Sequence, residues 1–407
     1  MTQGAGTGGA ASALHDALDL ARDAERRRAV RALLRDPLLP AGAADFPAVR
    51  RHAGWLREWF ARETGWSLRI DPELARLRKT PADANDASRP ARVGGMPLRR
   101  RRYVLLCLAL TALERGEGQT TLGKLAEAVV TGAAEPRLAV AGVSFELDSR
   151  DDRGDLVAAV RLLIELGVLR RVAGDEGSYL SGGGDALYDV ERRVLAGLLT
   201  SRRGPSMIDA GTTEQRLAAL ADQPLADTDD ARNSALRHGL TRRLLDDPVL
   251  YYADLAPDEL AYLTSQRPAL LRRVSAVTGL EPEVRAEGIA MVDQAGSDAL
   301  TDVRTPEEGT DGHATLLLAE HLASFGPGTM AQLESVVAEL AAQHRSRWRK
   351  TVGDPGGVAA LTALAVNRLV ALRLARRDAG DPDTVSPLPA LARFRLGVLD
   401  DAQVSFA

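Results

Sequence analysis

The chain has 407 residues, a net charge of −4 and a hydrophobic fraction of 45%, which is enough for the cores of two or three domains. Aromatic residues make up only 4%, so those cores must consist mainly of Leu, Val and Ala. No apolar run approaches the ~20 residues of a membrane span, and no secretory signal pattern is visible, so a soluble, cytoplasmic protein is expected. The single cysteine, Cys107, lies in the apolar run YVLLCLALTAL and is expected in the core of a reduced protein.

Charge is unevenly distributed along the chain. Residues 1–115 carry 21 basic and 13 acidic side chains, which gives +8 there and −12 over the remainder. A basic region on an acidic body can face nucleic acid or an acidic partner. Of the 52 basic residues only three are Lys, so a single Arg is weaker evidence for phosphate binding than usual.

The N-terminal part is predicted to be mainly helical. Residues 1–12 have the small, polar composition of a disordered tail, and residues 13–97 are predicted to form an N-terminal helical region with a small hairpin and a linker. In chain order we expect a helix stopped by Asp-Pro, a helix capped by Gly65, a hairpin interrupted by a second Asp-Pro, and the linker: residues 14–34, 46–64, 66–79 and 80–97.

Residues 98–199 are predicted to form a first winged-helix domain. Thr120 or Thr121 is the expected N-cap of its second helix, and Asp151 or Asp152 that of its third, which ends at Gly167. The two remaining helices, a short strand and the two strands of the wing are expected at residues 98–114, 122–130, 142–147, 168–172 and 187–190.

A polar, weakly periodic loop or insertion, 200–233, precedes a middle helix-and-hairpin region, 234–308. The elements expected in the middle region are a helix, a strand, a second helix and two further strands: residues 234–245, 249–252, 257–277, 284–292 and 300–303.

Residues 309–407 are predicted to form a C-terminal winged-helix domain. Two helices are expected over 313–323 and 330–348, the second capped by Thr329. The segment 358–396 then repeats the order of 155–190: an apolar helix, a β-branched strand, an acidic Gly-rich turn and a returning strand. The predicted fold class is therefore mainly α with small β wings (α+β), with tandem winged-helix domains plus an N-terminal helical region.

One segment nearly matches a phosphate-binding loop. GQTTLGKL, residues 118–125, approaches the pattern GxxxxGK[ST], which needs a hydroxyl after the Lys to hold Mg²⁺ and a strand before the loop. Leu125 has no hydroxyl, and the preceding segment has the length of a helix. No nucleotide cofactor is expected.

The densest group of acidic and His residues lies between Glu283 and His321. His313, Glu320 and His321 would share one helix face and could hold a divalent metal for a nuclease or hydrolase. The alternative is structural, because Glu283, Arg285 and Glu287 alternate with apolar residues as on the solvent face of a strand. No diagnostic ligand spacing is present, so neither a metal site nor catalytic residues are predicted.

Two basic runs are the candidate DNA contacts. They are Arg99, Arg100, Arg101 and Arg102, which open a helix, and Arg345, Arg347, Arg349 and Lys350, which close one. Cations suit a helix C-terminus, but they are mildly unfavourable at an N-terminus. The first run therefore needs an acidic partner or a DNA backbone.

The predicted third helices are unsuited to reading bases. A DNA-reading helix presents several polar side chains to the major groove. From Asp155 to Leu166 the interior polar residues are only Arg161 and Glu165, and from Val358 to Leu369 they are also few. Helices that are apolar around most of their circumference are buried on more than one side, so their outer faces are expected to meet protein.

Several blocks of the sequence resemble one known family. VRRHAGWLREWF (49–60), RRYVLLCLAL (101–110), QTTLGKLAE (119–127), LTRRLLDDPVLYY (240–252), EVRAEGIAMVD (283–293) and TDVRTPEEGTDGHATLLLAEHLA (301–323) are similar to the MukE-like (kite) subunits of type II Wadjet anti-plasmid systems. The resemblance covers nearly the whole chain after the N-terminal tail. It implies tandem winged helices that bind a kleisin-like (MukF-like) subunit and assemble with an SMC-type ATPase and a topoisomerase-related nuclease subunit. It transfers no catalytic residue.

The function expected from the sequence is that of a non-catalytic, kleisin-binding and dimeric subunit of an SMC-like DNA-surveillance complex that restricts plasmid DNA. Such a protein would be cytoplasmic and associated with the nucleoid, and its contacts with double-stranded DNA would be sequence-independent. Two alternatives remain open: a stand-alone winged-helix DNA-binding regulator, and a metal-dependent nuclease that uses the 283–321 acidic and His block.

Overall fold

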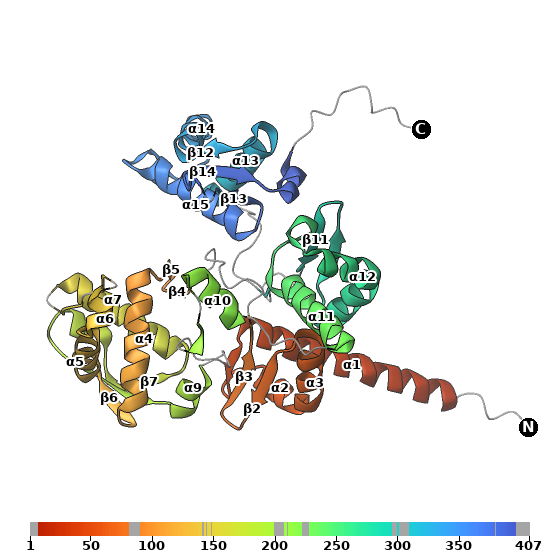
Figure 1. Cartoon of the computed structure of the whole chain (residues 1–407), viewed down its shortest axis with the longest axis horizontal. Coiled ribbons are helices and arrows are strands. Elements are labelled where there is room, and N and C mark those ends of the chain that lie inside the picture. Colours follow the sequence, from red (N-terminus) through yellow and green to blue (C-terminus); the bar gives the residue numbers. More distant parts are fainter. Residues whose placement is uncertain are drawn as a thin grey trace, which may run out of the picture.

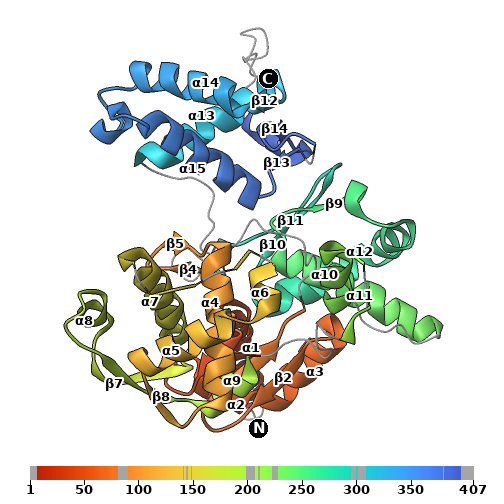
Figure 2. The same cartoon turned by 60° about the vertical axis from the view of Figure 1, so that its left-hand side comes forward.

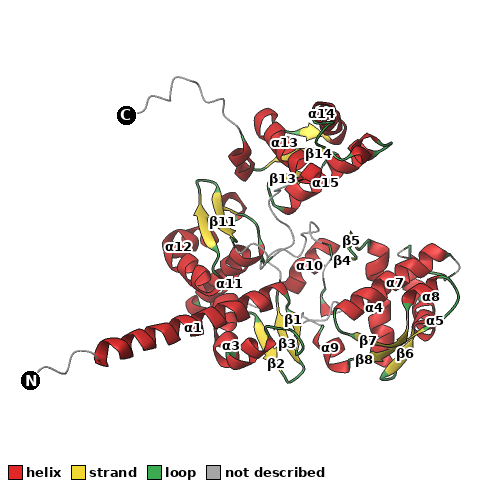
Figure 3. Ribbon diagram, turned by 180° about the vertical axis from the view of Figure 1, so that it is seen from behind, coloured by secondary structure: helices red, strands yellow, loops and turns green. Residues whose placement is uncertain are grey.

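A computed structural model of the chain is mainly helical with small antiparallel sheets, which confirms the predicted fold class (Figure 3). It describes residues 7–80, 90–198 (except 141, 144 and 148), 207–221 (except 210), 228–294, 299–300 and 309–395 (except 379). Within this part of the chain there are four sheets of three strands, and in each the strand that comes third in sequence lies between the first and the second. Each sheet is built with the helix–strand–helix–strand–strand order of a winged helix. The structure thus has four winged-helix units, two more than the regions to which the sequence assigned that fold.

The N-terminal unit spans residues 7–80. Its elements are α1 (Thr7–Arg35), β1 (Leu38–Pro40), α2 (Phe46–Arg51), α3 (Ala53–Thr64), β2 (Ser67–Ile70) and β3 (Leu74–Arg78), with the sheet order β1-β3-β2. The expected C-cap is confirmed, because Gly65 has φ +66°. Two expectations are wrong here. Residues 7–12 belong to α1, whose N-terminal part extends away from the body of the unit (Figure 3), and the helix over 46–64 is broken at His52.

The inserted unit spans residues 91–198. It contains β4 (Arg92–Val93), β5 (Met96–Pro97), α4 (Arg100–Arg115), β6 (Gln119–Thr121), α5 (Leu122–Ala133), α6 (Pro136–Val140), α7 (Arg150–Glu165), β7 (Leu169–Gly174), α8 (Glu176–Leu180), β8 (Ala186–Val190) and α9 (Arg192–Gly197). The Thr121 cap is confirmed, since its Oγ1 accepts the Lys124 N–H at 3.2 Å. The strand expected over 142–147 is wrong: its described residues form no strand, and β6 pairs with the wing strand β8 instead. Ser149, not Asp151 or Asp152, caps α7. The end of the expected linker is the β4–β5 hairpin.

The middle unit spans residues 229–294. It consists of α11 (Asp229–Asp246), β9 (Leu250–Tyr251), one 3-10 turn (Tyr252–Asp254), α12 (Pro257–Thr278), β10 (Glu281–Val284) and β11 (Gly288–Val292). The strand expected over 284–292 is interrupted by a turn, in which the Arg285 N–H donates to the Gly288 carbonyl. The expected loop 200–233 is also wrong in part, because it contains α10 (Thr213–Ala221) and the start of α11. Most of the strand expected over 300–303 lies outside the described residues.

The C-terminal unit spans residues 309–395. Its elements are α13 (Gly309–Phe325), β12 (Gly328–Thr329), α14 (Met330–Gln343), α15 (Gly357–Ala371), β13 (Ala375–Arg377), β14 (Thr384–Pro387) and a 3-10 helix, η5 (Pro389–Phe394). The Thr329 cap is confirmed as a capping box with Gln332. The expected wing after the third helix is also confirmed, as β13 pairs with β14. However, α14 ends five positions before Trp348, where the backbone turns at His344.

The N-terminal and middle units pack against each other, although the inserted unit separates them in sequence (Figure 1). The first helix of each unit contacts the third helix of the other: α1 lies on α12, and α11 lies on α3. The two units also share sequence, with RALLRDP at 31–37 and RRLLDDP at 242–248, and Thr-Gly at each third-helix C-cap. The two units therefore form a pair with approximate two-fold symmetry within one chain.

Among the described residues, no helix is both long enough and apolar enough to cross a lipid bilayer.

Candidate interaction surfaces

The pair of units is joined by matching polar contacts at the ends of the two third helices. The Arg31 guanidinium donates to the Thr278 carbonyl at 3.0 Å, and the Arg242 guanidinium donates to the Thr64 carbonyl at 2.7 Å. These carbonyls belong to the last turns of α12 and α3, which lack intrahelical donors and carry the negative end of the helix dipole. Both arginines are buried, and burial lowers the pKa of Arg242 to about 10. The C-terminal turns of α3 and α12 are consequently covered by the first helix of the other unit.

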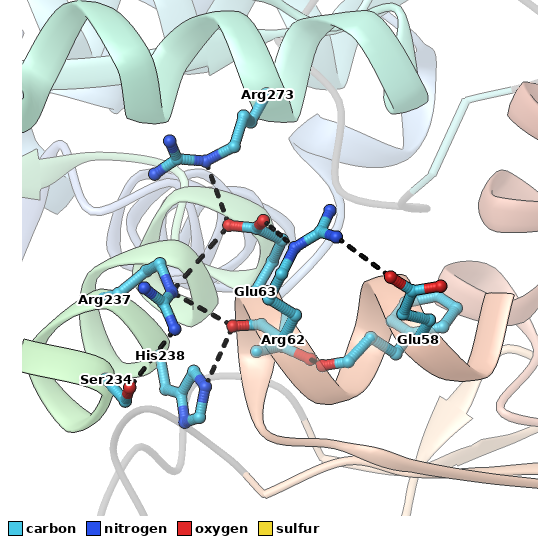
Figure 4. A network of polar contacts seen from close by, with 9 residues as sticks. Glu58, Arg62, Glu63, Ser234, Arg237, His238 and Arg273 are labelled. Atoms are coloured by element: carbon cyan, nitrogen blue, oxygen red, sulfur yellow. Dashed lines mark hydrogen bonds and ion pairs between the residues drawn. The ribbon is translucent and has the colours of Figure 1, made fainter. Parts of the chain in front are cut away.

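A buried carboxylate strengthens one side of this pair. Glu63, on α3, is 3% exposed, and three arginines surround it (Figure 4). Its Oε1 accepts the Arg62 Nε–H at 2.8 Å, and its Oε2 lies 3.0 Å from Nε of Arg273 on α12 and 4.0 Å from Nε of Arg237 on α11. Because these last two arginines come from the middle unit, Glu63 ties the two units together electrostatically.

His238 is a titratable side chain within this pairing. It sits on α11 at the position that Arg27 occupies on α1, and its Nε2 lies 3.0 Å from the Arg62 carbonyl. Burial lowers the pKa of His238, although the Arg62 carbonyl acts in the opposite direction. A histidine whose folded-state pKa is below its unfolded value of about 6.5 binds a proton more readily when unfolded. Its contribution is therefore complete above that value and is lost as the pH falls through the folded pKa.

We expect the free energy of unfolding to decrease between about pH 7.5 and pH 5.5, and His238→Gln to remove part of that decrease. Urea unfolding of both proteins at the two pH values measures the effect. His15→Gln, on the exposed part of α1, is the control. An unchanged pH dependence in His238→Gln would contradict the assignment.

The third helix of the inserted unit is covered in a different way. The β4–β5 hairpin lies beside α7 (Figure 2). Val93 of the hairpin and Leu98, just after it, form a small buried cluster with Leu162 of α7. This accounts for the apolar circumference of α7 noted from the sequence, since one face packs on α4 and another on the hairpin. A helix packed on two sides presents few side chains to a major groove.

Helix α15 is the remaining third helix, and its main neighbours are elements of its own unit, α13, α14 and β13. Its outward positions include Ala360 and Asn367, both exposed. Asn367 already accepts from Arg377 at 3.3 Å, so α15 has few polar groups for reading bases.

The first basic run is divided between internal ion pairs and exposed positions. Arg101 pairs with Asp152, and Arg102 Nε lies 2.7 Å from Asp155 Oδ1, both acids being in the first turns of α7. The acidic partner expected for this run is therefore present for half of it. Arg99 and Arg100 are exposed, and neither has an acidic partner among the described residues. The same is true of Arg92 on the hairpin and Arg161 on α7.

The second basic run is also divided. Arg349 NH1 lies 2.7 Å from Asp311 Oδ1, which fixes the end of the α14 connection to α13. Arg345, Arg347 and Lys350 are exposed and have no acidic partner in the described part of the chain. Of the eight residues predicted to contact DNA, the five exposed, unpaired ones are thus the best placed to do so.

The described members of the acidic and His block do not come together. Glu283 is on β10 and pairs with Arg285 and with Arg393 of η5, so it belongs to the boundary between the middle and C-terminal units. His313 accepts the Trp348 indole N–H at 3.1 Å and contacts His344, whereas His321 packs on Phe325. Burial lowers the pKa of His313, and His344 and Arg347 lower it further. Asp302, Glu307 and Glu308 lie outside the described residues.

No cluster of three or more potential metal ligands occurs among the residues that the structure describes. In the segment that nearly matches a phosphate-binding loop, a side chain already occupies the position of an anion. The Gly123 N–H, at the start of α5, donates to the Asp185 carboxylate at 3.0 Å, so a side chain takes the place that a phosphate would need.

A family model described as "Protein of unknown function (DUF2398)" matches residues 30–397. The chain belongs to the DUF2398 family. Neither the search of curated proteins nor that of solved structures returned a match. The match in this DUF2398 protein begins within α1 and includes residues of all four winged-helix units, the inserted unit among them.

One further surface of the DUF2398 chain corresponds to the pairing face of the other units. In α1, Arg31 and Arg27 lie two and six positions before the buried Leu33, and both contact the middle unit. In α11, Arg242 and His238 lie two and six positions before the buried Leu244, and both contact the N-terminal unit. In α4 the equivalent positions before the buried Leu113 are Thr111 and Cys107, and both are exposed. The expectation of a buried Cys107 is therefore wrong. A Cβ added to Gly167, at the end of α7, would meet nothing within 4 Å, whereas one on Gly65 would contact His238. We call this open surface of α4 and the α7 C-terminus the α4 face.

Proposed function

We propose that this protein is a non-catalytic, kleisin-binding subunit of an SMC-like DNA-surveillance complex that restricts plasmid DNA. The observation that carries the proposal is that α3, α7 and α12 each pack against a segment outside their own winged-helix core, namely α11, the β4–β5 hairpin and α1. Packing on a second side reduces the surface that a third helix can present to bases, which favours a role in protein binding over base reading. The resemblance of the sequence blocks to MukE-like subunits supplies the proposed partners: a kleisin-like (MukF-like) subunit, an SMC-type ATPase and a topoisomerase-related nuclease subunit.

DNA contact in this proposal is with the phosphate backbone. Exposed arginines that have no acidic partner among the described residues lie at the α4 N-terminus, on the neighbouring hairpin and on the outer side of α7. Because the hairpin covers one side of α7, these cations would meet phosphates and not base edges. Binding would then be independent of sequence and would weaken strongly with salt.

The proposed assembly also contains two copies of this chain, joined through the α4 face. The support is internal: the same face already joins the N-terminal and middle units, with the same fold on both sides of the contact. In the inserted unit that face is open and carries small or apolar side chains, and an isologous contact would cover both copies equally.

Cys107→Arg should therefore convert the dimer to a monomer, because it places a cation in the centre of the face. Sedimentation velocity over a range of protein concentrations measures the change. Thr131→Arg, on an exposed position of α5, is the matched control and should leave the dimer intact. A wild-type chain that is monomeric at every concentration would refute this part of the proposal.

Co-expression with a kleisin-like (MukF-like) protein tests the main proposal. The two chains should elute together in size-exclusion chromatography and remain together in moderate salt. If this chain elutes alone, folded and without any partner, the proposal fails. Purification of a sequence-specific DNA complex instead would favour the stand-alone regulator.

A further inference from the structure

In each of the four winged-helix units, a residue just after the third helix has the left-handed backbone conformation. Just after each of three third helices a glycine has positive φ: Gly65 at +66°, Gly167 at +72° and Gly279 at +76°. In the C-terminal unit this place is taken by Arg373, with φ +53°. Arg373 and Gly167 have the same pattern of backbone hydrogen bonds. The N–H of each donates to the carbonyl three residues earlier, and the N–H of the next residue donates to the carbonyl five residues before itself.

Arg373 is the only residue other than glycine with positive φ in the part of the chain that the structure describes. For an L-residue with a side chain this conformation is disfavoured, because Cβ comes close to the carbonyl oxygen. Glycine would satisfy the local fold at a lower cost, so the reason for an arginine must lie elsewhere.

The side chain of Arg373 reaches across to the middle unit. Its NH1 lies 2.8 Å from Asp247 Oδ2, just after α11, and its NH2 lies 3.0 Å from Asp254 Oδ2 in the 3-10 turn. Its own carbonyl accepts the Tyr251 hydroxyl at 2.7 Å. Burial raises the pKa of Tyr251 to about 12, so this phenol remains a donor at neutral pH. Three contacts from one strained residue therefore join two units.

The rest of the boundary between these units is small and mixed. Val249 and Tyr251 of the middle unit enter the apolar cluster of the C-terminal unit beside Leu391. Next to them a second ion pair joins Arg393 to Glu283 at 2.9 Å, on the edge of an open hollow that Glu283 and Arg393 help to line. Boundaries of this size and polarity usually permit movement of one domain on the other.

We propose that Arg373 is a latch that holds the C-terminal unit on the middle unit in one orientation, and that breaking its two ion pairs frees the C-terminal unit to move as a separate body. The latch is independent of the proposed assembly. Opening would uncover Val249 and Tyr251, both nearly fully buried when the units are joined. The arginine is kept at a glycine position because it joins the units, at the expense of local backbone strain.

A distance measurement between the two units tests the latch. Spin labels are placed on Arg267→Cys of α12 and Gln343→Cys of α14, both exposed, in the full chain with Cys107→Ser. We expect a single narrow distance distribution at low ionic strength. Arg373→Gly should broaden it several-fold while leaving the thermal unfolding temperature unchanged or higher, because the backbone strain is relieved. Arg345→Ala, which removes an exposed arginine of the same unit, should leave the distribution narrow.

Asp247→Asn combined with Asp254→Asn separates the two effects of Arg373. This variant keeps the arginine and its strained backbone but removes both charges that it binds, so the distribution should broaden as in Arg373→Gly. It also decides the result if Arg373→Gly fails to fold. A narrow distribution in the folded variants would overturn the latch, and earlier unfolding of Arg373→Gly with the narrow distance retained would show a role in folding only.

Discussion

Glu63→Ala should lower the free energy of unfolding by about 3 kcal/mol, the low end of the effect of removing one partner from a buried ion pair. The carboxylate is almost fully buried, and its removal leaves Arg237 and Arg273 of the middle unit close together without compensation. The low end applies because those two arginines are partly exposed and can regain water. Urea unfolding followed by circular dichroism measures the loss.

Glu58→Ala provides the matched control for this experiment. Glu58 is on the same helix and pairs with the same Arg62 at 3.4 Å, but its side chain is 73% exposed (Figure 4). An exposed pair of this kind contributes at most about 0.5 kcal/mol. If the two variants were equally stable, the pairing of the N-terminal and middle units would not depend on Glu63, and the two-fold arrangement would need another source of stability.

Arg99→Glu combined with Arg100→Glu should weaken binding to duplex DNA by roughly 10–100-fold at moderate salt, whatever the sequence, because two phosphate contacts become repulsive. The dependence of log affinity on log salt should also become shallower by about 2. Fluorescence anisotropy with several unrelated duplexes, each over a range of salt concentrations, measures both quantities.

The control for the DNA experiment is Arg57→Glu, an exposed arginine on α3 without an acidic partner among the described residues. Arg57→Glu reverses one charge where the double variant reverses two, and Arg57 lies on the N-terminal unit. It should therefore leave the affinity for DNA unchanged. A loss of affinity confined to one duplex sequence would indicate base reading and favour the regulator. No loss with any duplex would remove DNA contact from the first basic run.

The fold was predictable from the sequence in those units where the pattern of apolar residues marks both the helices and strands and their buried faces. The C-terminal and inserted units have long apolar third helices followed by two short strands, so their order was recognisable from the residue pattern. The N-terminal and middle units were harder, because the Pro257–Thr278 helix follows a single 3-10 turn in place of a second helix. A comparison of the chain with itself could have revealed them through RALLRDP at 31–37 and RRLLDDP at 242–248.

The interaction surfaces were less predictable, because they depend on which segments meet in space. The apolar circumference of α7 indicated a second buried face, but nothing in the composition of residues 90–98 identified them as its cover. Arg101 and Arg102 could not be distinguished from Arg99 and Arg100, since only the approach of Asp152 and Asp155 separates paired from exposed members of the run. Arg373 gave no signal at all, because backbone conformation is invisible in a sequence without a Gly or Pro.

A plasmid-restriction assay tests the central claim most directly. Cells carrying the complete set of neighbouring genes are transformed with a small plasmid and compared with cells that lack only this gene. If the protein is an essential non-catalytic subunit, the deletion should abolish restriction, and both the wild-type gene and His321→Ala should restore it. Full restriction without the gene would contradict the account, and loss of restriction by folded His321→Ala would revive a metal-dependent nuclease.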